Sequence, residues 1–107
     1  MPWYYYVAYF FAGAFLANGV PHFVQGICGN TFQTPFASPP GVGESSAVVN
    51  VVWGWINFVI ACSLILAAFS PLPPPIGGCV AGALGALGIV LLTSRHFGKV
   101  RHAPRAP

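Results

Sequence analysis

Three apolar stretches decide what this chain can fold into. They cover residues 3–20, 47–69 and 76–94, and none of them contains Asp, Glu, Lys or Arg. A bilayer core of about 30 Å is crossed by roughly 20 helical residues, so each stretch has the length of a transmembrane helix. We therefore expect an all-α integral membrane fold, in which residues 1–107 form a single domain with three transmembrane helices.

The charged residues are too few to cover a water-soluble domain. They make up 5% of the chain, against roughly a quarter in soluble domains, and Glu44 is the one acidic residue. The basic residues all lie in a C-terminal tail over 95–107: Arg95, Lys99, Arg101 and Arg105. Because basic residues are retained on the cytoplasmic side, this tail predicts a cytoplasmic C-terminus and an N-terminus outside. A short tail is not a nucleic-acid-binding face, so we expect a lipid bilayer and no nucleic acid as partner.

Two connections join the apolar stretches. The sequence SPLPPP is short and ends the helix over 47–69, so it predicts an antiparallel hairpin with the helix over 76–94. Residues 21–46 are too polar and glycine-rich for an ordinary crossing, yet contain several Phe residues, so we expect an interfacial or re-entrant linker. Pro21 leaves two alternatives: it begins a short separate helix, or the first helix continues through a kink toward residue 28.

Polar residues inside the apolar stretches form two helical faces. Asn18 and His22 are four residues apart, and Asn50, Trp53 and Asn57 follow helical spacing in the second stretch. The predicted topology brings both faces to the same membrane boundary. Lipid makes buried polar groups costly, so they normally face protein. Further residues of this polar layer are Gln25, Glu44, Arg95 and His96.

The polar layer has three readings. It forms interhelical hydrogen bonds, worth ~0.6 kcal/mol each on average in membrane proteins. Alternatively, it forms a small site for a lipid headgroup, a quinone ring or a small solute, with His22 as donor and Trp53 as a flat wall. A third reading pairs His22 with His96 as haem ligands. We expect no metal site, no cofactor beyond the haem or quinone alternatives and, in the absence of any catalytic motif, no enzyme.

Small residues form a smooth face on the third stretch. Such a face allows a second helix to approach closely, either in the same chain or in a neighbour. We expect an accessory or assembly subunit that packs against a larger membrane complex or forms a homo-oligomer. The alternatives are a small oligomeric transporter or channel lined around His22 and Asn50, and a quinone- or haem-associated subunit of an electron-transfer complex. The face consists of Gly78, Ala81, Gly82, Gly85, Ala86 and Gly88.

Overall fold

Three long helices make up most of the protein. The structure, a computed structural model, describes residues 2–67 and 74–103. The elements follow in the order α1 (Trp3–Ile27), β1 (Phe32–Gln33), β2 (Glu44–Ser45), α2 (Ala47–Ala67) and α3 (Ile76–Arg101). About 75% of the described residues are helical, as the uncharged stretches predict.

Each helix is long and apolar enough to cross a membrane. Their 25, 21 and 26 residues correspond to about 37, 31 and 39 Å at 1.5 Å per residue, against about 30 Å for a bilayer core. Large apolar side chains cover their outer faces: Leu16, Trp55 and Leu92 are all more than half exposed. Such faces need no protein cover when lipid surrounds them.

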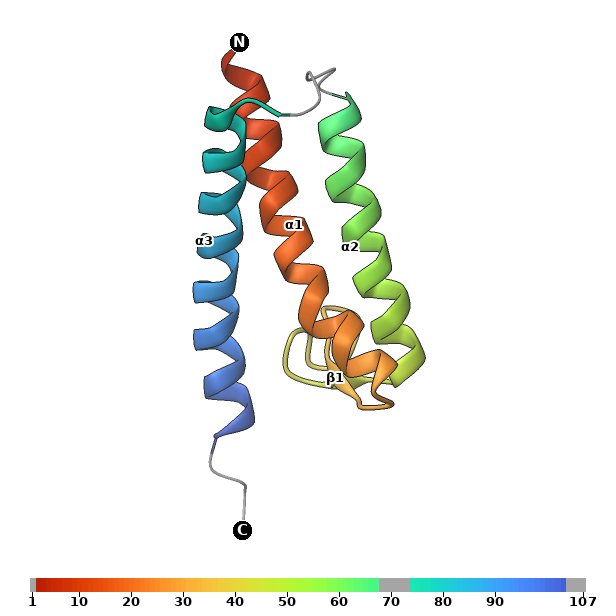
Figure 1. Cartoon of the computed structure of the whole chain (residues 1–107). Coiled ribbons are helices and arrows are strands. Elements are labelled where there is room, and N and C mark those ends of the chain that lie inside the picture. Colours follow the sequence, from red (N-terminus) through yellow and green to blue (C-terminus); the bar gives the residue numbers. More distant parts are fainter. Residues whose placement is uncertain (1, 68–73, 104–107) are drawn as a thin grey trace.

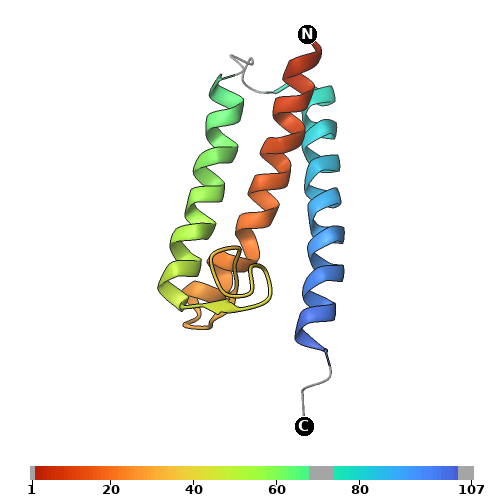
Figure 2. The ribbon, with the colours of Figure 1, turned by 180° about the vertical axis from the view of Figure 1, so that it is seen from behind.

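The first helix is the centre of the bundle. α1 packs against both other helices and lies between them (Figures 1 and 2). α1 and α3 run in the same direction, and α2 runs opposite to both (Figure 1). The chain from the end of α1 to the start of α2 therefore folds at one end of the bundle, which we call the loop end.

The hairpin expected of residues 47–69 and 76–94 stays a prediction. α2 and α3 are antiparallel, but α1 separates them over most of their length (Figure 2). The connection between them, over 68–73, lies outside the described residues. α1 can lie between α2 and α3 because glycine residues on two of its sides allow both helices to approach closely.

The packing of α3 against α1 depends on glycine. A Cβ atom at Gly85 would collide with the carbonyl oxygen of Phe10, and one at Gly13 would collide with the carbonyl oxygen of Gly82. The two backbones therefore approach more closely than any other residue would allow. The smooth face predicted on α3 thus lies against α1 of the same chain at these positions.

The remaining small residues of that face differ in their surroundings. Gly78 lies under the ring of Tyr9, where a Cβ would come within 2.7 Å of a ring atom. Ala81 and Ala86 are half-buried, and a Cβ at Gly88 would meet nothing within 4 Å. The part of the face nearest the loop end is therefore open.

α1 continues through Pro21 to Ile27, beyond residue 20 where the first span was expected to end. Proline lacks the N–H that would bond one turn back, but tertiary contacts hold the continued helix. Gly26 lies so close to α2 that a Cβ there would come within 2.7 Å of the carbonyl oxygen of Ala47. The helix ends where the amide of Cys28 bonds to the carbonyl of Val24, so the linker is shorter than residues 21–46.

α3 also extends beyond its expected end at residue 94. Arg95, Lys99 and Arg101 are helical, whereas Arg105 lies outside the described residues. Lys99 and Arg101 occupy the last turn, where basic side chains suit the negative end of the helix dipole. These cations therefore lie at the loop end (Figure 1).

Candidate functional site

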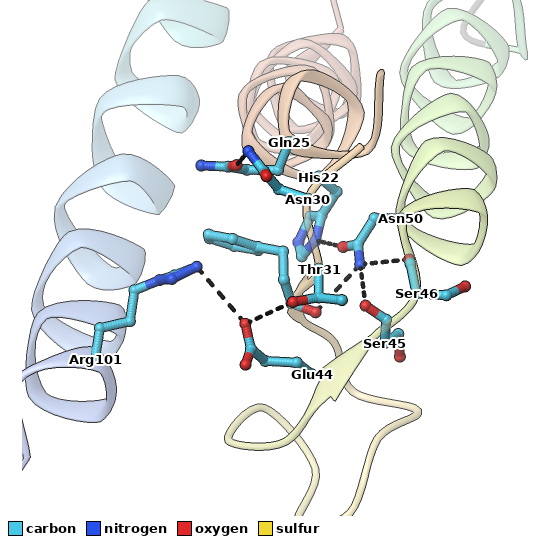
Figure 3. A network of polar contacts seen from close by, with 10 residues as sticks. His22, Gln25, Asn30, Thr31, Glu44, Ser45, Ser46, Asn50 and Arg101 are labelled. Carbon is cyan, nitrogen blue, oxygen red and sulfur yellow. Dashed lines mark hydrogen bonds and ion pairs between the residues drawn. The ribbon is translucent and has the colours of Figure 1, made fainter. Parts of the chain in front are cut away.

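A buried histidine and a buried asparagine join α1 to α2 at the loop end. His22 is 3% exposed and Asn50 is 0% exposed. His22 Nδ1 lies 2.9 Å from Asn50 Oδ1 (Figure 3). Buried polar groups are costly unless they are bonded, so this pair fixes how the two helices meet.

The surroundings of Asn50 assign the proton of the imidazole. Asn50 Nδ2 lies 3.2, 3.1 and 3.0 Å from the carbonyl oxygens of Phe32, Ser45 and Ser46 (Figure 3). Only an NH₂ group can donate to carbonyl oxygens, so the oxygen of the amide faces His22. His22 Nδ1–H therefore donates to Asn50, and in the neutral ring Nε2 carries the free lone pair.

This assignment bears on what His22 can offer to a ligand. The sequence suggested that His22 would donate to a ligand, but its donor nitrogen is used by Asn50. Within residues 2–67 and 74–103, no side chain or backbone group bonds to Nε2 of His22. The imidazole therefore offers an acceptor to a ligand.

A second polar pair lies deeper in the bundle. Asn18 Nδ2 donates to Asn57 Oδ1 at 3.0 Å, and Asn57 Nδ2 donates to the carbonyl oxygen of Trp53 at 2.8 Å. Asn57 is completely buried. The two pairs therefore connect the same faces of α1 and α2, at the spacing that the sequence predicts.

Glycines between the polar residues make these bonds possible. Gly19 and Gly54 face one another, and a Cβ at Gly19 would come within 2.8 Å of the Gly54 carbonyl oxygen. Short side chains such as asparagine reach across only when the helix backbones are this close. The close approach at Gly19 and Gly54 therefore positions both polar pairs.

The loop from Cys28 to Ser46 folds back over His22. Its short antiparallel ladder pairs Phe32 with Ser45 and Gln33 with Glu44. The hydroxyl groups of Thr34 and Ser45 are 2.5 Å apart, and the Phe32 ring lies edge-on to His22 with centroids 5.3 Å apart. The loop thus forms a folded cap on this end of the bundle.

The end of α3 holds the cap in place. His96 Nε2–H donates to the carbonyl oxygen of Gly41 at 2.6 Å, and the Phe97 ring packs 4.9 Å from that of Phe32. The Arg101 guanidinium lies 4.7 Å from the centre of the Phe32 ring and 3.9 Å from the Glu44 carboxylate. α3 therefore contributes a third wall to the site.

A cavity of about 200 Å³, which we call the polar pocket, lies between these three walls. Among the described residues, no Asp, Glu, Lys or Arg side chain lines it. Two buried polar atoms of its lining residues have no bonding partner in the part of the chain that the structure describes, Gln33 Oε1 and Trp53 Nε1. The lining residues are Asn18, His22, Gln33, Thr34, Pro35, Gly41, Trp53, His96 and Phe97.

The structure brings some of the predicted site residues together and separates others. Asn18, His22, Trp53 and His96 line the polar pocket, while Asn50 and Asn57 support it by hydrogen bonds. Two of the predicted residues bond elsewhere: Gln25 accepts a hydrogen bond from Asn30, and Glu44 accepts one from Thr31 (Figure 3).

Sequence reasoning missed the contribution of the loop. Gln33, Thr34 and Gly41 line the pocket, as does Phe97 of α3. The loop residues have no helical spacing that would assign them to a face. The available signal was the combination of polar and aromatic residues in TFQTPF, which predicts a segment in contact with the bundle and not a free loop.

No group of three or more His, Cys, Asp or Glu side chains is placed to hold a metal ion among the described residues. Cys28, Cys62 and Cys79 are exposed and form no disulfide bond. Comparison with protein-family models, curated proteins and solved structures finds no match to this chain, so the site is interpreted from its own geometry.

Proposed function

We propose that this is an integral membrane protein that binds a small uncharged ligand in the polar pocket. The observation that carries the proposal is the pair of unpartnered atoms, Gln33 Oε1 and Trp53 Nε1, in residues that line one cavity. A buried polar atom without a partner costs about 1–3 kcal/mol. A group that enters the pocket and bonds to these atoms, such as a ligand, offsets that cost.

The donors and acceptors of the pocket indicate the chemistry of the ligand. Gln33 Oε1 and His22 Nε2 are acceptors, and Trp53 Nε1–H is a donor. A hydroxyl group both donates and accepts, so it matches all three. The lack of charged lining residues favours an uncharged ligand over a phosphate or an ammonium group.

The volume of the pocket limits the size of the ligand. Sites for drug-sized molecules have volumes of roughly 300–1,000 Å³, whereas the polar pocket measures about 200 Å³. This favours a single ring or headgroup over a haem macrocycle. His22 and His96 both line the pocket, but each already uses one ring nitrogen for a hydrogen bond within the protein.

The proposed orientation places the polar pocket on the cytoplasmic side of the membrane. Arg95, Lys99 and Arg101 lie at the same end of the bundle as the pocket, and basic residues are retained in the cytoplasm. Labelling of a cysteine introduced at His102, in a variant whose Cys28, Cys62 and Cys79 are replaced by alanine, tests this orientation in intact cells and in lysed cells. Labelling in intact cells by a reagent that does not cross membranes would contradict it.

Fluorescence of Trp53 tests the proposed binding. The changes Trp3→Phe and Trp55→Phe leave Trp53, in the pocket wall, as the single tryptophan. We expect hydroquinone, as a hydroxylated ring without a tail, to change its emission in a saturable way. Quenching that rises linearly without saturation would reflect collisions and would refute the proposal.

Matched variants connect that signal to the pocket. Gln33→Leu removes one unpartnered acceptor, and His22→Ala removes the free imidazole nitrogen, so we expect both to weaken binding. His102→Ala is the control, because His102 is exposed and lies outside the pocket. Equal affinities of all three variants would show that hydroquinone binds elsewhere.

An accessory subunit is the second candidate function. An apolar groove of about 510 Å³ lies over α1 between α2 and α3, and its lining includes Gly82, Ala83 and Ala61. Small apolar residues of this kind allow the transmembrane helix of a partner to approach closely. We expect Ala83→Phe to release a partner that otherwise copurifies in mild detergent, and retention of that partner would count against this candidate.

The oligomeric channel receives less support from the same geometry. Asn50 and Asn57 are completely buried and bonded within the chain, so they have no free polar groups to offer a water-filled pathway. A flux of protons or small solutes into reconstituted vesicles that disappears in Asn50→Leu would restore this candidate.

A further inference from the structure

A second cavity adjoins the polar pocket. It measures about 240 Å³, and we call it the side cavity. Asn18 lines both cavities, so its side chain lies between them. All other residues around the side cavity are apolar: Phe11, Ala14, Phe15 and Ile89.

One face of α1 connects the two cavities. Phe11, Phe15, Asn18 and His22 follow one another at intervals of four, three and four residues, which places them in one stripe along the helix. The stripe is about 16 Å long at 1.5 Å per residue. Its side chains change from aromatic to polar toward the loop end. The stripe therefore matches a ligand that has an apolar tail and a polar head.

Three aromatic rings pack around His22, and two of them, Trp53 and Phe97, also line the polar pocket. The rings of Phe32, Trp53 and Phe97 all lie edge-on to His22, with centroids 5.3, 6.4 and 6.4 Å from that of the imidazole. Aromatic rings favour this edge-to-face arrangement with a further ring at 4.5–7 Å, typically worth about 0.5–1.5 kcal/mol in packed sites. A flat aromatic head therefore suits the pocket better than a flexible polyol.

The side cavity also faces outward. Phe11 is 49% exposed, whereas Ala14 and Phe15 are half-buried. In a bilayer this opening would face the acyl chains, so a tail in the side cavity would extend into lipid without leaving an apolar environment. A ligand could thus enter sideways from the membrane, without crossing water.

We propose that the ligand is a hydroxylated aromatic ring with a long apolar tail, whose ring occupies the polar pocket and whose tail lies along the side cavity. This inference rests on the proposed function, because it requires that the polar pocket binds an uncharged head. It adds the class of ligand and the route by which the ligand reaches the site.

The single-tryptophan protein tests the inference with three ligands. Hydroquinone has the ring alone, dodecyl hydroquinone adds the tail, and dodecyl glycerol keeps the tail but replaces the ring by a flexible diol. We expect dodecyl hydroquinone to bind more tightly than dodecyl glycerol by about tenfold. Equal affinities of the two tailed ligands would overturn the aromatic head.

A variant of the side cavity tests the path of the tail. Ala14→Phe fills the side cavity, so we expect it to lower the ratio of dodecyl hydroquinone affinity to hydroquinone affinity by about tenfold. Val59→Phe is the control, because Val59 is exposed on α2 and lines none of the cavities described above. Dodecyl hydroquinone partitions into the micelle more than hydroquinone does, but it does so equally in samples of both variants. A difference in the affinity ratio between the variants therefore reports on the protein. An unchanged ratio in Ala14→Phe would overturn the tail path.

Crosslinking provides a second test that needs no variant to fold. A diazirine in the middle of the dodecyl chain is expected to label Phe11, Phe15 or Ile89, and labelling of Cys62 in the apolar groove would overturn the inference. Failure of the proposed function is distinguishable, because hydroquinone itself would then show no saturable binding. If hydroquinone binds and the tail has no effect, the proposed function stands and the inference fails.

Discussion

Asn50 offers a direct test of the polar layer, because one side chain there satisfies several buried groups. Its Oδ1 lies 2.9 Å from His22 Nδ1, and its Nδ2 lies 3.2 Å from the carbonyl oxygen of Phe32. Asn50→Leu keeps a similar volume but leaves both groups without their partner. Each buried polar group left unpaired costs about 1–3 kcal/mol, so we expect the free energy of unfolding to fall by about 2–6 kcal/mol. The lower end is expected in micelles, where the separated helices find other partners.

A double-mutant cycle isolates the bond between the two side chains. His22→Phe removes the Nδ1–H group that donates to Asn50. In a protein that already carries His22→Phe, Asn50→Leu therefore leaves no imidazole N–H unpaired. The two changes together should therefore destabilise less than the sum of the single changes, by about 1–3 kcal/mol. Titration of the purified protein with a denaturing detergent, followed by circular dichroism, measures each free energy of unfolding.

Thr93 supplies the control for this cycle. Its hydroxyl bonds to the carbonyl oxygen of Ile89 in its own helix, 2.9 Å away, and not to the polar layer. Asn50→Leu and Thr93→Val should therefore be additive within about 0.5 kcal/mol. If Asn50→Leu and His22→Phe are also additive within that limit, the bond does not contribute to folding and the reasoning about the polar layer is refuted.

Three further predictions concern α3, the imidazole and the cap. Gly85→Ala should lower the free energy of unfolding by about 1–3 kcal/mol, because the added methyl group collides with α1. Gly88→Ala should change it by less than about 1 kcal/mol, because a Cβ at that position would meet nothing within 4 Å. Equal effects of the two changes in detergent titrations would contradict the packing of α3 against α1. Nitrogen NMR of neutral His22 should place the proton on Nδ1, and a protonated Nε2 would be evidence against the assigned tautomer. His96→Ala removes a bond to the Gly41 carbonyl, so amide hydrogen exchange around Gly41 should accelerate; unchanged exchange would show that α3 does not hold the cap.

The helices were the most predictable part of the fold. Uncharged stretches of about 20 residues leave few alternatives to a helix, because a helix satisfies its own backbone groups in lipid. The end of α1 was less predictable, since Pro21 is compatible with either a break or a continuation. Continuation depends on contacts with α2, including Gly26 against Ala47 and His22 against Asn50, and such contacts leave no local signal in the sequence.

The candidate site also has a part that the sequence predicts and a part that it does not. Helical spacing groups Asn18 with His22 and Asn50 with Asn57, and the structure joins these groups in two bonded pairs. Spacing does not say which nitrogen of His22 donates, because that depends on carbonyl oxygens of the cap. The contribution of Gln33 was likewise hidden, since its position follows from a ladder of only two residue pairs.

The central position of α1 has a consequence for biogenesis. In the proposed membrane location, α1 is made before α2 and α3, so Asn18 and His22 would first meet acyl chains, where polar side chains are costly. Both find their partners in α2, the next helix to emerge, and none of these four groups waits for α3. We therefore expect α1 and α2 to enter the membrane as a pair, and α3 then completes the polar pocket by adding His96 and Phe97 as its third wall.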